Sequence, residues 1–326
     1  MAPLLEIKGL KTHFSTDDGI VRAVDGVDIS INRGETLCVV GESGCGKTVT
    51  AMSILQLIAM PPGRIVAGEI IFEGRDLVPL TSHQLDEVRA KEIGFIFQEP
   101  MTSLNPVLTV GEQIAESLRV HERLPQKQAF ARTIEMLKLV QIPNAEARVN
   151  DYPHQFSGGM RQRVMIAMAL ACQPKLVIAD EPTTALDVTI QAQILDLLQD
   201  MKERFGMAVM LITHAMGVVA ETAQRVVVMY AGKVVEEADV DSLFADPRHP
   251  YTQGLIRSIP RIDLDSEHKS RLETIGGSVP ILIDPPPGCR FAPRCRHVMN
   301  VCREREPVLR QIAAGHRMAC HLGEAP

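Results

Sequence analysis

Two stretches of this 326-residue sequence have the residue types and spacing that phosphate chemistry needs. The first is the loop GESGCGKT, residues 41–48, which follows the apolar run LCVV and precedes the helical pattern VTAMSILQLIAM. Glycines let backbone N–H groups turn inward, and a helix N-terminus adds partial positive charge, so such a loop cradles phosphate. We expect Lys47 to reach the β- and γ-phosphates of a nucleotide and the Thr48 hydroxyl to ligate Mg²⁺. Cys45 is assigned no chemistry, because such a loop acts mainly through its backbone.

The second stretch is KLVIADE, residues 175–181, an apolar run that ends in two carboxylates. Asp180 is predicted to hold Mg²⁺ through water, and Glu181 to polarise an attacking water as general base. A third run, AVMLITH, ends in His214, although a histidine at a strand end is more often structural than catalytic. Strands of one parallel sheet that all end in polar residues are typical of ligand sites in open α/β folds.

The motif FSGGM, residues 156–160, precedes the helical pattern RQRVMIAMALAC. Ser157, Gly158 and Gly159 would open this helix and form a second anion site from backbone amides and a hydroxyl. The two predicted phosphate-binding helix starts lie over a hundred residues apart in the sequence. This separation suggests that two subunits share each nucleotide.

Composition sets the frame for these motifs. The chain is 45% apolar and long enough for two compact units, so it is expected to fold. Its net charge of −6 gives no basic face, and nucleic acid is therefore not an expected partner. The longest apolar run, residues 164–172, is too short to cross a bilayer. The start MAPLLEIKGL has no secretion-signal pattern, so the thiols are expected to stay reduced.

Taken in order, GESGCGKT, Gln98 at the end of IGFIFQ, FSGGM, KLVIADE, ALD (185–187) and ITH resemble the ATP-binding subunit of an ABC transporter. The resemblance implies an α/β fold with a P-loop (RecA-like) core, an antiparallel β subdomain and a helical subdomain over about residues 100–169. It places the ABC ATPase domain at residues 1–258 and a small Cys-rich C-terminal extension at residues 259–326.

The resemblance also implies a head-to-tail dimer, with ATP held between the phosphate loop of one subunit and Ser157 and Gly159 of the other. Gln98 would sense Mg²⁺ and couple to membrane subunits, and Asp187 would cross the dimer interface. Phe14 would stack on adenine, although strand packing explains it equally well. The implied catalytic residues are Glu181 and His214, and the implied Mg²⁺ residues are Thr48, Gln98 and Asp180. The implied ATP-binding residues are Phe14, Gly41, Glu42, Ser43, Gly44, Cys45, Gly46, Lys47, Thr48, Gln98, Ser157, Gly158, Gly159 and Asp187.

Two further stretches, FQEPMTSLNPVLTVGEQI (97–114) and PRHPYTQGLIRSIP (247–260), resemble ATPases of the dipeptide and oligopeptide permease group. This resemblance covers essentially the whole chain and implies ATP-driven import of di- and oligopeptides from the cytoplasmic face of the inner membrane, with the subunit bound peripherally. The implied partners are a second, paralogous ATPase in a heterodimer, two membrane permease subunits and an extracytoplasmic substrate-binding protein. Importers of nickel, glutathione or glycosides share this sequence style. A non-transport ABC regulatory protein is the alternative from another class, although an inactive regulator would lack Glu181.

The segment PPGCRFAPRCRHVMNVCREREP, residues 286–307, carries three of four clustered cysteines, Cys289, Cys295 and Cys302, and Cys320 follows. Residues 289–326 offer few apolar side chains, and four thiolates binding a metal would supply on the order of 10 kcal/mol of folding energy. The gaps of five, six and 17 residues match no common zinc ribbon. They favour a [4Fe–4S] cluster, which some members of the resembled group carry, over Zn²⁺ or unliganded thiols.

The run of Asp284, three prolines and Gly288 is interpreted as a boundary before this segment. Because the nucleotide motifs all lie upstream of residue 215, we expect the segment to be separate from the ATPase chemistry. It would order itself or a contact with partner subunits, and redox sensing is the less favoured role. Its histidines, His297, His316 and His321, are expected at the surface. Cys38 and Cys172 lie in apolar stretches and are expected to be buried.

Overall fold

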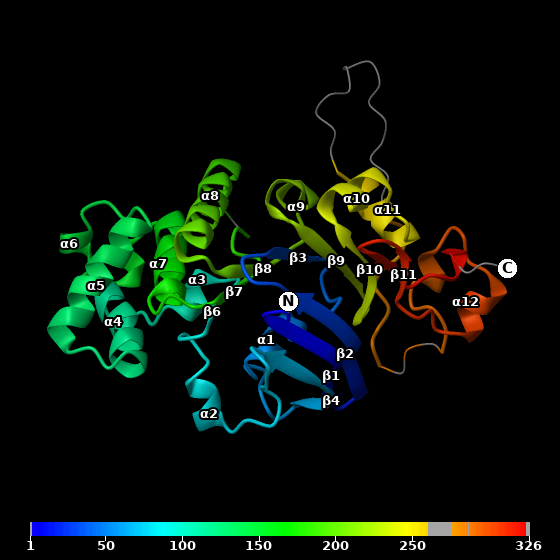
Figure 1. Ribbon diagram of the computed structural model, residues 1–326, viewed down its shortest axis with the longest axis horizontal. Coiled ribbons are helices and arrows are strands. Elements are labelled where there is room, and N and C mark those ends of the chain that lie inside the picture. Colours follow the sequence, from blue (N-terminus) through cyan, green and yellow to red (C-terminus); the bar gives the residue numbers. More distant parts are fainter. Residues whose placement is uncertain (1, 185, 260–274, 284, 286, 324–326) are drawn as a thin grey trace, which may run out of the picture. The chain divides into compact units, whose positions relative to one another are not determined.

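The structure, a computed structural model, describes residues 2–184, 186–259, 275–283, 285 and 287–323 (Figure 1). Ala185 of the ALD motif, residues 260–274 of the predicted extension, and Asp284 and Pro286 of the connector lie outside the described residues. The chain divides into two compact units. The first unit contains Met1–Ala2, Ile31–Glu35 and Pro79–Ile212, and the second unit contains Pro3–Ser30, Thr36–Val78 and Thr213–Pro326.

Parallel strands form the sheet of the first unit. These strands are β6 (Ile93–Ile96), β7 (Leu176–Asp180) and β8 (Ala208–Thr213). β7 pairs with β6 on one side and with β8 on the other, always in parallel. Every residue of β7 and β8 is buried, which is the pattern of parallel strands covered on both faces. The strands predicted from IGFIFQ, KLVIADE and AVMLITH are therefore confirmed.

Helices make up most of the rest of the first unit. They are α2 (Ser82–Asp86), α3 (Pro100–Ser103), α4 (Val110–His121), α5 (Gln126–Leu139), α6 (Ala145–Arg148), α7 (Gly158–Leu170) and α8 (Val188–Phe205), with a 3₁₀ turn η1 (Pro153–Gln155) before α7. α4 shows why they form: the Thr109 hydroxyl caps it, and Val110, Ile114 and Leu118 make a buried stripe at a spacing of four. Figure 1 shows α3 to α7 gathered together within this unit.

The second unit contains an antiparallel sheet, as the resemblance implies. Its strands are β1 (Leu5–Thr16), β2 (Gly19–Ile31), β4 (Gly63–Phe72) and β5 (Arg75–Asp76), in the order β2-β1-β4-β5. A further group of strands begins with β3 (Thr36–Val40), which runs parallel to β9 (Arg225–Tyr230). β9 in turn pairs antiparallel with β10 (Lys233–Asp239). The helices of this unit are α1 (Lys47–Ile54), α9 (Met216–Thr222), α10 (Val240–Ala245) and α11 (Pro250–Arg257).

Residues 287–323, called the Cys-rich tail from here on, continue the second unit. The tail contains η2 (Ala292–Arg294), α12 (Asn300–Glu304), β11 (Arg310–Ala313), β12 (His316–Met318) and η3 (His321–Gly323). β12 pairs antiparallel with β10, and Ala319 N–H donates to the Val235 carbonyl at 2.9 Å. In Figure 1 this orange-to-red segment lies beside β10. The tail therefore adds strands to a sheet edge that the rest of the chain provides.

Across the residues that the structure describes, none of the helices combines the length and the apolar character that a bilayer span requires.

Candidate functional site

The phosphate loop, residues 41–48, connects β3 to α1 in the second unit. Its outer glycines have left-handed backbone, with φ of 152° at Gly41 and 102° at Gly46. A Cβ at Gly41 would lie 2.3 Å from the Met229 carbonyl oxygen, and one at Gly46 would lie 2.4 Å from the Ala23 carbonyl oxygen. Only glycine fits at either position, so the close approach of β9 and β2 fixes the curl of the loop.

Lys47 starts α1 and lies buried within this curl. Its Nζ donates to the carbonyl oxygens of Gly41 at 2.8 Å and Glu42 at 3.1 Å. The Lys47 ammonium is therefore held against the loop at which we expect the nucleotide phosphates to bind. Cys45 is fully buried, and burial raises the pKa of its thiol, which agrees with the absence of an assigned chemistry.

Glu42, the second residue of the loop, is held by two residues from far along the chain. Arg294 of the tail forms a bidentate ion pair with the Glu42 carboxylate, with Nη1 2.5 Å from Oε2 and Nη2 2.9 Å from Oε1. The Glu42 backbone N–H donates to the Tyr251 hydroxyl at 2.8 Å. The tail therefore contacts the phosphate loop directly, through an arginine next to Cys295, while its predicted separation from the ATPase chemistry stays a prediction.

The aromatic rings of Tyr230, Tyr251 and Phe291 pack against one another in the second unit. Phe291 of the tail meets Tyr230 of β9 edge-on with ring centroids 5.1 Å apart, and it lies 5.4 Å from Tyr251. Tyr230 and Tyr251 meet at 4.7 Å. Such edge-on pairs add stabilisation beyond the area that they bury. A second tail arginine, Arg290, bonds to Asp25 and to the carbonyl of Ala231.

A buried carboxylate connects the HPYT element with β12 of the tail. Glu236 of β10 accepts hydrogen bonds from the backbone N–H of His249 at 2.9 Å and from His316 Nε2 at 2.7 Å. His316 is therefore buried, and so is His321, whose Nε2 bonds to the Arg305 carbonyl at 2.8 Å. The expectation that both histidines lie at the surface is wrong, while His297 is exposed as expected.

The carboxylates predicted to act on Mg²⁺ and water lie in the first unit, at the end of β7. Asp180 is buried and is the last residue of the strand. Glu181 follows with a left-handed φ of 46°, held by its N–H bond to the Ile212 carbonyl at 2.9 Å. Its Oε2 accepts from Gln98 Nε2 at 3.1 Å and from Thr184 Oγ1 at 2.9 Å. A strained backbone that is fixed on several sides is typical of functional positions.

The FSGGM motif and Asp187 also lie in the first unit, where each begins a helix. The Ser157 hydroxyl caps α7 by accepting from Met160 N–H at 3.4 Å, and Asp187 caps α8 by accepting from Ile190 N–H at 3.0 Å. A Cβ at Gly159 would come 2.8 Å from Ile190, so glycine allows α7 and α8 to approach closely. The predicted second helix start is confirmed.

The remaining predicted site residues lie in different places. Ser43, Gly44 and Thr48 are exposed on the phosphate loop, and His214 is exposed directly after β8. Phe14 of β1 is half-buried, and a Cβ added at Gly63 would lie 2.8 Å from its ring, so Gly63 leaves room for it. The structure thus brings Gln98 and Glu181 together in the first unit. The phosphate loop, Phe14 and His214 belong to the second.

The four tail cysteines are near one another, and backbone N–H groups point at their sulfurs. Burial raises the pKa of Cys320 to about 11, and the charges of the other three thiols add to this effect. Cys295 Sγ accepts from His297 N–H at 3.4 Å, and Cys302 Sγ accepts from Met299 N–H at 3.5 Å. Backbone donors also serve Cys289 and Cys320. Such donors suit thiolates bound to metal.

The side chains of the tail do not converge into a closed ligand shell. Among the residues that the structure describes, no three or more His, Cys, Asp or Glu side chains are grouped closely enough to hold a metal ion. The backbone donors to the sulfurs therefore fit a metal group bound by thiolates, whereas the positions of the side chains do not. Cys38 and Cys172, by contrast, are buried in apolar surroundings as predicted.

Sequence reasoning missed Arg294 and Tyr251 as residues that hold the phosphate loop. Tyr251 belongs to the HPYT element, which had been noted only for its resemblance to a transporter group. Arg294 belongs to the segment that the sequence marks by its cysteines and prolines rather than by its arginines. The signal that could have drawn attention to it is its position beside Cys295, in a segment with too few apolar residues to fold alone.

A glycine-locked loop between a buried parallel strand and a helix, in an α/β unit, defines a P-loop nucleotide-binding protein. Residues 24–184 match the ABC transporter family, and residues 235–302 match the oligopeptide/dipeptide transporter C-terminal region. The chain belongs to the ABC transporter family, in the group that carries this C-terminal region.

Relatives align along nearly the full length of the chain. It is 56% identical over 97% of its residues to a probable peptide ABC transporter ATP-binding protein, y4tR, of Sinorhizobium fredii, covering 94% of that protein. It is 54% identical over 96% of its residues to the oligopeptide transport ATP-binding protein OppD of Bacillus subtilis, covering 87% of it. Among solved structures, the ATP-binding cassette MJ0796 bound to ADP and Pi matches 72% of this chain and 98% of its own, at 29% identity and a TM-score of 0.65. The ABC ATPase fold is thereby confirmed.

Proposed function

We propose that this chain is the ATP-hydrolysing subunit that powers import of di- and oligopeptides through an ABC transporter. The observation that carries the proposal is the match of residues 235–302 to the oligopeptide/dipeptide transporter C-terminal region, because an ATP-binding cassette alone does not indicate a cargo. The full-length similarity to peptide transporter ATP-binding proteins supports the same assignment.

The proposed chemistry is hydrolysis of ATP with Mg²⁺. Lys47 and the amides of the phosphate loop bind the phosphates, and Thr48, Gln98 and Asp180 are assigned to Mg²⁺, which would neutralise developing phosphate charge. Glu181 takes the proton of the attacking water, since its carboxylate is oriented by an amide and a hydroxyl. His214 contacts the γ-phosphate. The other proposed ATP-binding residues are Phe14, Gly41, Glu42, Ser43, Gly44, Cys45, Gly46, Ser157, Gly158, Gly159 and Asp187.

The proposed assembly is a head-to-tail pair of ATPases, with a second, paralogous chain as the partner. Ser157 and the glycines after it would contribute the start of α7 to the nucleotide held by the partner's phosphate loop. Residues 97–114 are proposed to receive a cytoplasmic helix of a membrane permease subunit. The chain would thus be peripheral on the cytoplasmic face of the inner membrane, in a complex with two permease subunits and a substrate-binding protein.

The test is transport by the complete complex. The chain would be reconstituted with its permease, partner ATPase and binding-protein subunits, identified from neighbouring genes, in vesicles loaded with ATP. We expect uptake of labelled di- or oligopeptides, and no competition by excess nickel, glutathione or glycosides. Uptake of one of those cargoes in place of peptide would assign a related importer, and ATP turnover without any transport would favour a regulatory protein.

We also propose that Cys289, Cys295, Cys302 and Cys320 hold a [4Fe–4S] cluster, with Zn²⁺ as the alternative. The support is the set of four nearby thiols and the backbone N–H groups aimed at their sulfurs. Anaerobic purification with iron, sulfide and zinc analysis tests it, and we expect four irons and four sulfides per chain. Stoichiometric zinc without sulfide would overturn the cluster, and neither metal would overturn both.

A further inference from the structure

Arg294 lies in the tail, yet its guanidinium forms an ion pair with Glu42 of the phosphate loop. Its side chain is only 4% exposed, while the Glu42 side chain that it pairs with is 30% exposed. The two are separated by 252 residues in sequence. A bidentate arginine–carboxylate pair fixes distance and orientation together, which a single-point contact does not.

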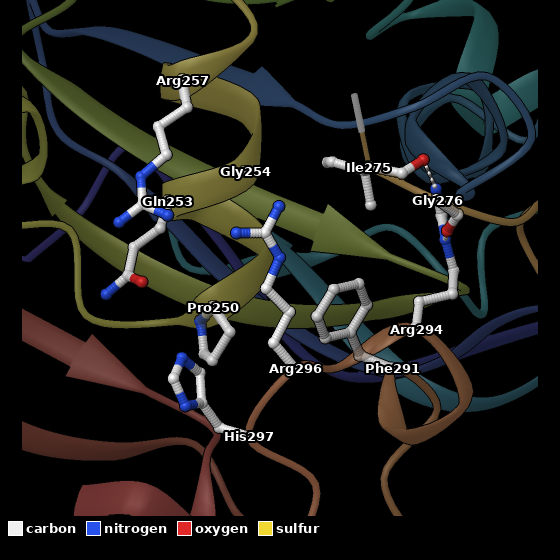
Figure 2. Close-up of a pocket in the computed structure, with 10 residues that line it drawn as sticks. All are labelled: Pro250, Gln253, Gly254, Arg257, Ile275, Gly276, Phe291, Arg294, Arg296 and His297. Atoms are coloured by element: carbon white, nitrogen blue, oxygen red, sulfur yellow. Dashed lines mark hydrogen bonds between the residues drawn. The ribbon is translucent and has the colours of Figure 1, made fainter. Parts of the chain in front are cut away.

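The guanidinium is itself held on its other sides. Nε donates to the Gly276 carbonyl at 2.8 Å, and Nη2 donates to the Ile275 carbonyl at 3.2 Å. The central guanidinium carbon, Cζ, lies 5.7 Å from the centre of the Tyr230 ring. Figure 2 shows Arg294 reaching residues 275 and 276 on the wall of a small cavity of about 60 Å³. Because these contacts fix the guanidinium, it holds the Glu42 carboxylate in one place.

Tyr251 completes the hold on the loop from its backbone side. Its hydroxyl accepts the Glu42 N–H, its own N–H donates to His249 Nδ1 at 3.1 Å, and its ring is fully buried. The side chain and the amide of Glu42 are thus both held by residues that lie downstream of the ATPase motifs.

We propose that Arg294 is a positioning residue for the phosphate loop, so that the Cys-rich tail sets the affinity of this loop for ATP. The inference rests on the proposed function, in which residues 41–48 bind ATP. Two physical effects act in the same direction. The ion pair keeps the loop in one conformation, which lowers the ordering cost of binding. It also compensates a carboxylate that would otherwise repel the negatively charged phosphates.

The test measures the KM for ATP and kcat separately in the assembled transporter. Arg294→Gln is expected to raise the KM for ATP about 10-fold, from one uncompensated charge near the phosphates, with kcat changed by less than about 3-fold. Arg303→Gln is the matched control, because Arg303 also follows the pattern of an arginine beside a tail cysteine but is exposed. An unchanged KM in Arg294→Gln, or an equal rise in Arg303→Gln, would overturn the proposal.

A double variant separates positioning by charge from mere support of the fold. In Glu42→Gln/Arg294→Gln neither charge is present, so the electrostatic repulsion is absent and we expect a KM clearly below that of Arg294→Gln alone. A double variant as weak as Arg294→Gln alone would contradict the electrostatic part of the proposal. If Arg294→Gln fails to fold, Arg294→Lys keeps the charge and loses the fork, and we expect about a 3-fold higher KM. An unchanged KM there would overturn the positioning role.

Lys47→Ala distinguishes failure of this inference from failure of the proposed function. We expect it to lose ATP binding, measured directly with a fluorescent ATP analogue. If Lys47→Ala binds the analogue normally, the assignment of residues 41–48 as the ATP site fails. If Lys47→Ala loses binding and Arg294→Gln retains full affinity, only the positioning role of Arg294 fails.

Discussion

Two glutamates follow buried strands in the nucleotide motifs, and they are held in opposite ways. Glu42, after β3, is paired with the guanidinium of Arg294. Glu181, after β7, accepts hydrogen bonds from the amide of Gln98 and the hydroxyl of Thr184. The Glu42 carboxylate is thus bound by a guanidinium at both oxygens, and the Glu181 carboxylate accepts from a side-chain amide and a hydroxyl at one oxygen.

This difference fits a structural role for Glu42 and the role of general base that we propose for Glu181. A bidentate ion pair occupies both oxygens and compensates the charge, so such a carboxylate serves to hold a loop in place. Neutral donors orient a carboxylate without cancelling its charge, which leaves it suited to attract a proton from water. The two glutamates also differ in range: Glu181 bonds within its own unit to the motifs around it, whereas Glu42 depends on residues more than 200 positions away.

The largest effect that would break the comparison is expected at Glu181. Glu181→Gln keeps the shape of the side chain and loses the base, so kcat for ATP hydrolysis should fall about 10²- to 10⁴-fold while ATP binding is retained. Phosphate release by the assembled transporter measures kcat, and a fluorescent ATP analogue measures binding. Glu146→Gln, at an exposed glutamate of the same unit, is the control and should leave turnover unchanged. Unchanged turnover in Glu181→Gln would place Glu181 with Glu42 as a structural residue.

The same contrast explains what could be predicted from the sequence. The phosphate loop, the strands β6, β7 and β8 and the cap of α7 by Ser157 depend on local patterns, such as apolar runs and a hydroxyl before two glycines. They were therefore recognisable. The contact of Arg294 with Glu42 depends on how distant segments meet, and no spacing in the sequence encodes it.

Burial of polar residues was the other point that local patterns could not reveal. His316 and His321 stand in a segment rich in charge, which favours an exposed position by composition alone. His316 is held by the Glu236 carboxylate of β10, outside the tail, and His321 by the Arg305 carbonyl within the tail. The tail was interpreted as separate from the ATPase motifs for the same reason, since its partners were not visible in the sequence.

We expect acid to destabilise the region that holds Glu42, because acid protonates the buried His249. Burial lowers the pKa of His249 from 6.5 to about 3, because the buried ring disfavours the charged form. The unfolded chain then binds a proton more readily than the folded one, so this contribution to stability is complete above pH 6.5 and is lost as pH falls toward 3. At pH 5 the loss is about 2 kcal/mol.

Urea unfolding at pH 7 and pH 5 measures this loss. His249→Asn keeps a side-chain acceptor for the Tyr251 N–H and does not titrate, so the difference in unfolding free energy between the two pH values should shrink by about 2 kcal/mol. His83→Asn, at an exposed histidine of the first unit, is the control. An equal pH dependence in the unmodified protein and in His249→Asn would show that His249 is not the acid-sensitive support.

A double-mutant cycle tests whether the tail acts on Glu42 through Arg294. Cys295→Ser removes a proposed metal ligand next to Arg294, and we expect it to raise the KM for ATP by up to about 10-fold, or about 1.4 kcal/mol. In Arg294→Gln/Cys295→Ser the two effects should not add, because both act by releasing the same carboxylate. Cys172→Ser, at a buried cysteine of the first unit, should show no such coupling with Arg294→Gln. Additive effects of Cys295→Ser and Arg294→Gln would mean that the tail influences ATP binding by another route.

The smallest expected effect concerns a neutral donor to Glu181. Thr184→Val removes the hydroxyl that bonds to Oε2, and a net hydrogen bond of about 1 kcal/mol corresponds to about a 5-fold fall in kcat. Thr189→Val, at an exposed threonine on α8, is the matched control. Because a neutral donor orients the carboxylate without changing its charge, the KM for ATP should stay constant in Thr184→Val. A rise in KM with constant kcat would instead assign Thr184 and Glu181 to holding the nucleotide, which is the role that the comparison gives to Glu42.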